Sequence, residues 1–275
     1  PLFHHLSEIS VIGVDFKTDD KGFYGLFRLA KKIKELRVDV VADMHNVLRT
    51  KILRFLLPNV SFSRLDKGRA EKQQLIKGAV FKPLKTTIER YADVFRALGL
   101  ELSLSAPHFP QPLPLSQSLK THLGSASRPF IGIAPFAAYT SKMYPIQQMK
   151  EVISKLSNTY SVLLFGSGAY EIKIIEAIVR QFPNVKSVAG VYSMQEELTL
   201  MSHLKVMLAM DSGNAHMAAM MGVNVITLWG VTHPYAGFAP FNQPSENCLL
   251  ADRKKYPKIP TSIYGNKHPK SYSNA

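Results

Sequence analysis

The sequence is poor in cysteine, in long apolar runs and in acidic residues, and each shortage excludes a class of protein. Its one cysteine, Cys248, excludes an intrachain disulfide and a cysteine-based zinc cluster. Such cysteine usage is typical of a reducing compartment, so we expect a cytoplasmic protein. No apolar run approaches the roughly 18 residues of a membrane span, and no signal peptide opens the chain. With 46% hydrophobic and 20% charged residues over 275 positions, the composition is that of a globular protein.

Basic residues outnumber acidic ones by 34 to 20, which gives a formal net charge of +14. The excess is concentrated in residues 49–96, which hold 12 basic and 4 acidic side chains. A field of this sign attracts phosphates, nucleic acids or anionic lipid surfaces. The alternative is a well-solvated basic surface without a specific ligand, and charge alone leaves both open.

Short apolar runs alternate with amphipathic stretches along the whole chain, which predicts an α/β fold. In the second half, strands are expected at 130–134, 162–165, 185–188, 206–210 and 223–229, with helices at 146–156, 170–182, 194–201 and 214–221. In the first half, strands are expected at 11–14 and 38–43, and helices at 23–36, 47–57 and 86–98. Unbroken apolar strands of this kind are typical of a parallel sheet covered by helices on both faces.

Four prolines between residues 105 and 114 predict a stiff linker, and therefore two domains. We expect an N-terminal domain over 1–104, the linker over 105–117 and a C-terminal domain over 118–251. Residues 252–275 are expected to form a basic, polar and poorly ordered tail. The N-terminal domain lacks the opening β-α-β unit of such an architecture. Because the chain starts at Pro1 and not at Met, we expect a further segment upstream.

Ligands of open parallel sheets bind beyond the carboxyl ends of the strands, so the loops there are the candidate sites. The loop after 130–134 contains Lys142, either a diphosphate ligand or a surface lysine. The turn at 166–171 begins like a dinucleotide fingerprint, but Glu171 replaces its third glycine, which opposes a nicotinamide oxidoreductase. Glu171 is suited either to ribose hydroxyls or to the positive end of its own helix.

The loop after 206–210 offers a second set of groups. Asp211 is expected to cap the next helix, and Ser212 and Gly213 offer free N–H groups to a phosphate, although caps of this kind are common. His216 lies about one helical turn further on and is able to reach the same place. Together with the turn at 230–232, these loops describe a nucleoside diphosphate site.

These residues also carry a family resemblance. The segment Asp211-Ser-Gly-Asn-Ala-His216, followed by Leu228-Trp-Gly-Val-Thr232 and Pro234, resembles the signature of glycosyltransferase family 9, the ADP-heptose:lipopolysaccharide heptosyltransferases and their relatives. Residues 39–50 resemble the family segment that ends near the acceptor. The resemblance covers roughly residues 10–250. It implies a GT-B fold, with two Rossmann-like domains, parallel sheets and an interdomain cleft, and an inverting transfer without metal or other cofactor.

The resemblance also implies roles for individual residues. The donor-binding residues would be Lys142, Ser212 and Gly213 on the diphosphate, Glu171 on the ribose, Tyr192 on the base, and Asp211 and His216 at the sugar-phosphate end. The acceptor-binding residues would be His45, Asn46 and Arg49. The family's catalytic base is an aspartate expected upstream of Pro1. Without it, we expect the chain as written to bind donor but not to turn over, with His45 as the substitute base to consider.

The sequence therefore predicts a glycosyltransferase that moves a heptose-like sugar from a nucleoside diphosphate donor, with ADP favoured, to a lipid-linked anionic glycan of the lipopolysaccharide core type. We expect a cytoplasmic monomer in peripheral contact with the inner membrane. Three alternatives stay open: a non-catalytic nucleotide-sugar binder, a nicotinamide oxidoreductase and a nucleic-acid-binding protein. No nucleic-acid-binding motif is visible, so nucleic acid is not expected as a partner.

Overall fold

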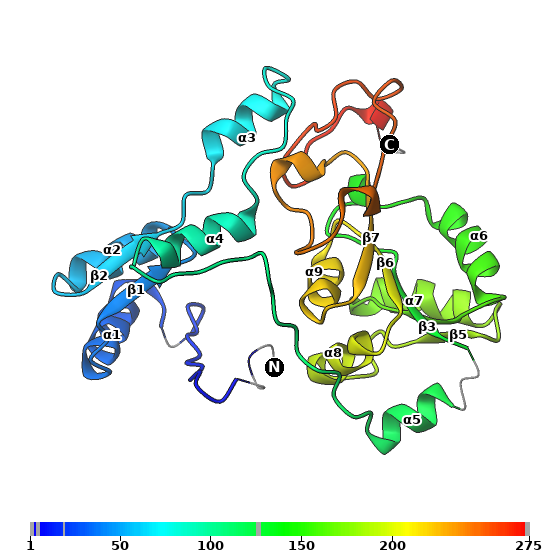
Figure 1. Ribbon diagram of the computed structural model, residues 1–275, viewed down its shortest axis with the longest axis horizontal. Coiled ribbons are helices and arrows are strands. Elements are labelled where there is room, and N and C mark those ends of the chain that lie inside the picture. Colours follow the sequence, from blue (N-terminus) through cyan, green and yellow to red (C-terminus); the bar gives the residue numbers. More distant parts are fainter. Residues whose placement is uncertain (1–2, 4–5, 19, 125–127, 273–275) are drawn as a thin grey trace. The chain divides into compact units, whose positions relative to one another are not determined.

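The computed structural model describes residues 3, 6–18, 20–124 and 128–272, and the chain falls into two units (Figure 1). The small unit comprises the described residues of Phe3–Arg69 and Lys85–Pro107. The large unit comprises those of Ala70–Leu84 and His108–Ala275. The segment Ala70–Leu84 thus packs with the C-terminal part of the chain.

The small unit contains a two-stranded parallel sheet among its described residues. Strand β1 (Val40–Asp43) pairs with β2 (Ser61–Arg64), and helix α2 (Leu48–Leu56) connects them. Helix α1 (Gly22–Glu35) and α2 share a core of Leu26, Ala30, Leu53 and Leu57. Helix α4 (Thr87–Arg96) begins where the Thr86 hydroxyl accepts a hydrogen bond from the Glu89 amide. The predicted helices and the strand at 38–43 are confirmed.

The strand predicted at 11–14 is wrong. These residues form a loop, and Val11 is 73% exposed. Four residues with Gly13 among them are stable as a strand only when a neighbouring strand pairs with them, and none of the described strands does so. Strand β2 was missed because Ser61–Arg64 is polar at alternate positions and short.

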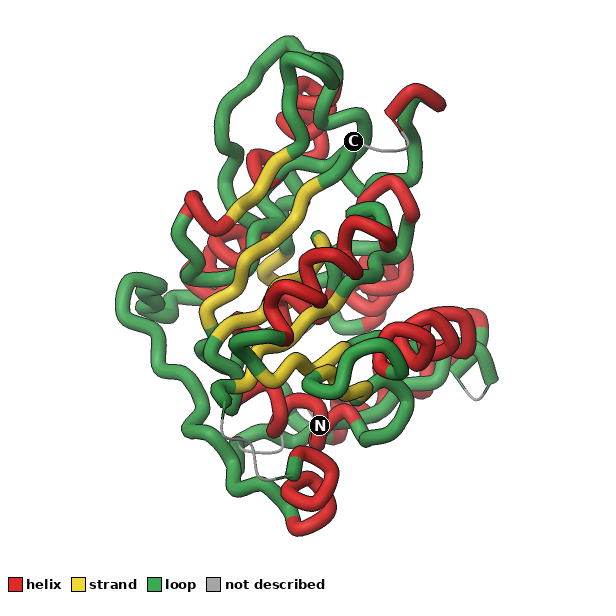
Figure 2. The backbone as a smooth tube through the Cα atoms, turned by 90° about the vertical axis from the view of Figure 1, so that its right-hand side faces the viewer, coloured by secondary structure: helices red, strands yellow, loops and turns green. Residues whose placement is uncertain are grey.

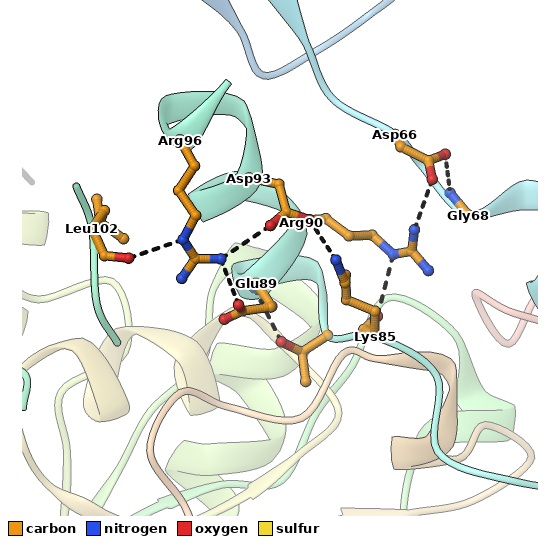
Figure 3. A network of polar contacts seen from close by, with 9 residues as sticks. Asp66, Gly68, Lys85, Glu89, Arg90, Asp93, Arg96 and Leu102 are labelled. Atoms are coloured by element: carbon orange, nitrogen blue, oxygen red, sulfur yellow. Dashed lines mark hydrogen bonds and ion pairs between the residues drawn. The ribbon is translucent and has the colours of Figure 1, made fainter. Parts of the chain in front are cut away.

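Part of the basic excess in residues 49–96 is neutralised inside the small unit (Figure 3). The pairs are Lys85 with Asp93, Arg96 with Glu89 and Asp93, and Arg90 with Asp66. Arg90 is buried and also donates to the Lys85 carbonyl, while Arg96 donates to the carbonyl of Leu102. These side chains fix α4 on its neighbours, so they do not belong to a basic surface that is free to bind a ligand.

The large unit contains a parallel sheet of the order β5-β4-β3-β6-β7-β8. Its strands are β3 (Phe130–Ala134), β4 (Ser161–Leu164), β5 (Val185–Ser187), β6 (Val206–Met210), β7 (Asn224–Trp229) and β8 (Cys248–Leu250). All neighbouring pairs are parallel. The five predicted strands of this half are confirmed, whereas β8 was missed because it is only a three-residue edge strand.

Helices cover both faces of this sheet, as Figure 2 shows. They are α5 (Gln117–Leu123), α6 (Ile146–Ser157), α7 (Gly168–Val179), α8 (Met194–Ser202) and α9 (Gly213–Met220), and α3 (Arg69–Ile76) precedes them in the chain. Alternation along one strand divides the core in two: Val162 and Leu164 pack with α6 and α7, whereas Leu163 packs with α5, α8 and α9.

The prediction of a poorly ordered tail is wrong for residues 252–272. Tyr256, Ile259 and Tyr272 are buried and form a small core with Val231. The Thr261 amide also donates to the Val231 carbonyl over 3.0 Å. These apolar side chains are spaced among lysines, so the composition of the segment is polar even though it packs on the loop after β7. No helix in the described part of the chain is long and apolar enough to cross a membrane.

Candidate functional site

The strand order of the large unit marks one place for a ligand. From β3 the chain adds β4 and β5 on one side, and then β6, β7 and β8 on the other, so the winding direction reverses between β3 and β6. Crevices for ligands form beyond the carboxyl ends of the two strands at such a reversal. Lys142, in the 3-10 helix η1 (Thr140–Lys142), follows β3, and Asp211 follows β6. The structure thus places both predicted donor-binding residues at this point.

Lys142 and Asp211 form an ion pair that is largely hidden from water. The distance from Lys142 Nζ to Asp211 Oδ2 is 2.8 Å, and the side chains are 12% and 9% exposed. The hydroxyl of Thr232, in the loop after β7, donates to the same carboxylate oxygen over 2.9 Å. Asp211 is therefore not the helix cap predicted from the sequence, because its carboxylate is held by a lysine and a threonine from two other loops.

The first residues of α9 present unused donors beside this pair. Ser212 is the residue before α9, and its buried hydroxyl has no hydrogen-bond partner among the described residues. A Cβ on Gly213 would meet no atom within 4 Å, so its backbone lies open. Buried hydroxyls are nearly always hydrogen-bonded, and helix N-termini bind anions through free N–H groups. The arrangement suits a phosphate.

His216 lies one turn into α9 and interacts electrostatically with both members of the pair. Although the residue is exposed at the surface, protein atoms crowd its ring, and this loss of solvation lowers the pKa of His216. The Asp211 carboxylate acts in the opposite direction, and Lys142 lowers the pKa further. A neutral imidazole offers one donor and one acceptor nitrogen to a ligand at neutral pH.

The other two predicted donor residues lie on neighbouring loops and make local contacts. Glu171 Oε2 accepts a hydrogen bond from the Ser167 amide over 2.8 Å, which is the role at the start of its own helix that the sequence left open. Tyr192 is half-buried against the core, and its ring meets the His122 ring edge-on at 5.4 Å. No contact among the described residues joins Glu171 or Tyr192 to Lys142.

The predicted acceptor residues follow β1 in the small unit. Asp43 is buried, and its Oδ1 accepts from the amides of His45 (3.0 Å) and Asn46 (2.7 Å). The Asn46 side chain donates to the Leu65 carbonyl over 2.8 Å, so it shapes the loop. The Arg49 guanidinium lies 4.2 Å from the ring centre of Phe16. His45 is exposed and available to a ligand.

The sequence analysis did not identify Gly265, the residue against which the side chain of Lys142 packs. Gly265 has φ +82°, and a Cβ there would lie 2.5 Å from Lys142 Cγ and 2.7 Å from Cδ. Its carbonyl accepts from the Ser141 hydroxyl and its amide donates to the Ser262 hydroxyl. We refer to residues 262–265 as the Gly265 turn. The Ser-x-x-Gly spacing signals a turn, but nothing in the sequence signals its partner 124 residues away.

His233 follows β7 and is buried between aromatic side chains. Its ring packs on Phe81 and Tyr235, and its Nδ1 accepts a hydrogen bond from the Tyr235 amide. Burial, together with the positive charge of Arg253, lowers the pKa of His233 from 6.5 to about 4. Between pH 6.5 and about pH 4, the His233 ring is therefore neutral in the folded protein but takes up a proton in the unfolded chain.

Stability should therefore fall as the pH falls through this window. The contribution of His233 is complete above pH 6.5 and is lost towards pH 4. Between pH 6.5 and 5 the loss is about 2 kcal/mol, at 1.36 kcal/mol per unit. Urea unfolding of the wild type and of His233→Asn, which keeps an acceptor for the Tyr235 amide, measures this difference. Equal pH dependence in the two proteins would contradict the assignment.

Comparison with known proteins points to one family. The sequence model of glycosyltransferase family 9 (heptosyltransferase) matches residues 26–268. The chain is 24% identical over 251 residues to the lipopolysaccharide core heptosyltransferase OpsX of Haemophilus influenzae, covering 88% of this chain and 70% of OpsX.

Solved structures show the same fold. The glycosyltransferase family 9 protein of Veillonella parvula aligns with a TM-score of 0.69 at 19% identity, covering 91% of this chain and 74% of that one. The E. coli heptosyltransferase WaaC with ADP aligns with a TM-score of 0.57 at 16% identity, covering 91% of this chain and 78% of WaaC. The fold is thus an α/β fold of the GT-B type, as the sequence predicted. Because the family match spans most of its length, the chain belongs to glycosyltransferase family 9 and is a glycosyltransferase.

Proposed function

We propose that this enzyme transfers a heptose-like sugar from an ADP-sugar to an anionic glycan of the lipopolysaccharide core type, with inversion and without a metal ion. The observation that carries the proposal is the convergence of Lys142, Asp211 and the unpartnered Ser212 hydroxyl at the reversal of the sheet. The names of the relatives, a lipopolysaccharide core heptosyltransferase and a heptosyltransferase with ADP, support the substrates.

The site has the groups that departure of a diphosphate requires. In the transfer, an acceptor hydroxyl attacks the anomeric carbon, the bond from that carbon to the diphosphate breaks, and the diphosphate leaves with the electron pair. Lys142 and the N–H groups at the start of α9 stabilise the charge that develops on it. Asp211 and Thr232 orient Lys142. A base takes the hydroxyl proton, and His45 is the candidate that the described residues offer.

Titration with ADP, UDP, GDP and NAD tests the donor. We expect ADP to bind most tightly and NAD most weakly, because Glu171 occupies the position of the third fingerprint glycine. Tightest binding of NAD, or no nucleotide binding, would contradict the proposal. Incubation with ADP-heptose and a lipopolysaccharide core acceptor then separates the alternatives. Donor binding without transfer is the result expected for the chain as written, whereas transfer would show that a base lies among its 275 residues. His45→Ala would then test whether His45 is that base.

We also propose that the protein is a cytoplasmic monomer in peripheral contact with the inner membrane through α2. Leu48 and Phe55 of this helix are 73% and 85% exposed, and Arg49, Lys51 and Arg54 lie exposed beside them. Mixed apolar and basic surfaces bind anionic lipid.

Sedimentation with vesicles tests this contact. Binding to anionic vesicles should fall as salt rises from 50 to 500 mM, because salt screens the attraction, and Phe55→Ser should weaken it. Neutral vesicles are the control. Salt-independent binding, or none, would contradict the proposal.

A further inference from the structure

A cavity of about 640 Å³ opens in the large unit, between the end of α3 and the tail. Its apolar lining includes Leu75 and Ile259, which are 1% and 2% exposed, and the ring of Phe81. Arg253, Lys258 and Lys267 from the tail also line it. We refer to this cavity as the tail pocket. Its size is in the range of small-molecule binding sites.

The charge of the tail pocket has one sign. Lys258 and Lys267 are exposed, and Lys77 adds a third ammonium group from α3's side. Among the described residues that line the pocket there is no carboxylate. Cationic groups around a low-dielectric wall concentrate anions, so the pocket favours an anionic ligand.

The wall of the tail pocket is hydrogen-bonded to the loop that carries Thr232. Thr261 lines the pocket, and its amide donates to the carbonyl of Val231. The next residue, Thr232, donates to the Asp211 carboxylate. Two hydrogen bonds thus connect the pocket wall, through the loop after β7, to the Lys142–Asp211 pair.

The aromatic surfaces distinguish between anionic ligands. The Arg253 guanidinium lies 3.5 Å from the ring centre of Phe81, and His233 and Tyr235 pack against the same ring. Phe81 is still 38% exposed, but Arg253 lies over one of its faces, which leaves less of the ring for a nucleobase. The remaining surface, aliphatic side chains and the prolines of the tail beneath cationic groups, matches the C–H faces of a sugar that bears acidic groups.

We propose that the tail pocket binds an acidic sugar unit of the acceptor, one that bears phosphate or carboxylate groups, and so selects the acceptor by its charge. The inference rests on the proposed transfer to an anionic glycan. It assigns the described tail, together with residues 75–81, to acceptor recognition.

The test uses the double variant Lys258→Gln/Lys267→Gln. Both side chains are exposed, so the fold should be preserved. Lys120→Gln/Lys155→Gln on α5 and α6 is the matched control, because it removes the same charge from exposed positions of the same unit. Calorimetry measures binding of deacylated lipopolysaccharide core oligosaccharide, before and after dephosphorylation, and of ADP.

We expect the pocket variant to bind the intact oligosaccharide at least about tenfold more weakly, the scale of one lost charge-assisted hydrogen bond. Its affinity for ADP should equal that of the wild type. The control variant should bind both the oligosaccharide and ADP as tightly as the wild type. Dephosphorylation should weaken wild-type binding if phosphate is the recognised group, and removal of the acidic sugars should do so if carboxylate is.

Three results would overturn the proposal: no oligosaccharide binding by the wild type, equal loss in the pocket and control variants, or competition by ADP for the oligosaccharide. Failure of the proposed donor function would give a different result. ADP would not bind to the wild type, whereas the pocket variant would still bind the oligosaccharide more weakly than the wild type.

Discussion

Lys142→Met should weaken ADP binding by about 1.5–3 kcal/mol, or roughly 10- to 150-fold, which is the scale of a hydrogen bond to a charged group. Methionine keeps most of the aliphatic stem that packs on Gly265, so the change removes the ammonium group and little else. Calorimetric titration of wild type and variant with ADP measures the effect. A change below a few tenths of a kcal/mol would remove Lys142 from the donor site.

The same variant should also unfold more easily. Asp211 would keep only the Thr232 hydroxyl as a partner, and breaking a largely buried ion pair costs about 3 kcal/mol. The double variant Lys142→Met/Asp211→Asn removes both charges and is the control. We expect it to regain stability in urea unfolding but not ADP affinity. If it regained both, the loss of affinity would come from the stranded carboxylate and not from the missing ammonium group.

Gly265→Ala should weaken ADP binding without touching the nucleotide. A Cβ at 2.5 Å from Lys142 Cγ forces the lysine stem to move, and Cγ is fixed at both ends, by the backbone and by the ion pair. We expect about a tenfold weaker ADP affinity, which corresponds to about 1.4 kcal/mol. A left-handed backbone also costs a non-glycine residue about 1–2 kcal/mol of stability.

Gly99→Ala is the matched control for this prediction. Gly99 has φ +84°, but a Cβ there would meet nothing within 4 Å, so it carries the backbone cost alone. In urea unfolding, both variants should show the same loss of stability from the left-handed backbone. Gly265→Ala should show a further loss from the contact with Lys142. Equal ADP affinity of Gly265→Ala and the wild type would show that the turn supports the fold and not the lysine.

The large unit could be predicted well because each of its inner strands is a continuous apolar run between clear turns. The same logic located Lys142 and Asp211, since both directly follow such strands. It failed where a contact joins distant segments. That Asp211 accepts from Lys142 and Thr232, and is not a helix cap, depends on strand order, and strand order is not readable from local patterns.

The short and polar elements were lost for a related reason. Strand β2 and the tail are stabilised by partners elsewhere in the chain. Phe62 of β2 pairs with Val41 of β1, and Ile259 of the tail packs on Val231. At 11–14 a strand was predicted where the structure has a loop. The run is apolar, but no described strand pairs with it. The domain limits and the roles of all the predicted donor-binding and acceptor-binding residues stay predictions.

The dependence of Lys142 on Gly265 has a consequence for biosynthesis. Lys142 leaves the ribosome long before residues 262–265, so a nascent chain carries the lysine while its support does not yet exist. The strands on either side of the sheet reversal are able to pair by then, but Ser141 finds its carbonyl partner only near the end of the described chain. If Lys142 holds the donor as proposed, the site is complete only after residue 265 has been made, and we expect a chain cut short before Ser262 to fold its sheet and yet hold a nucleotide weakly.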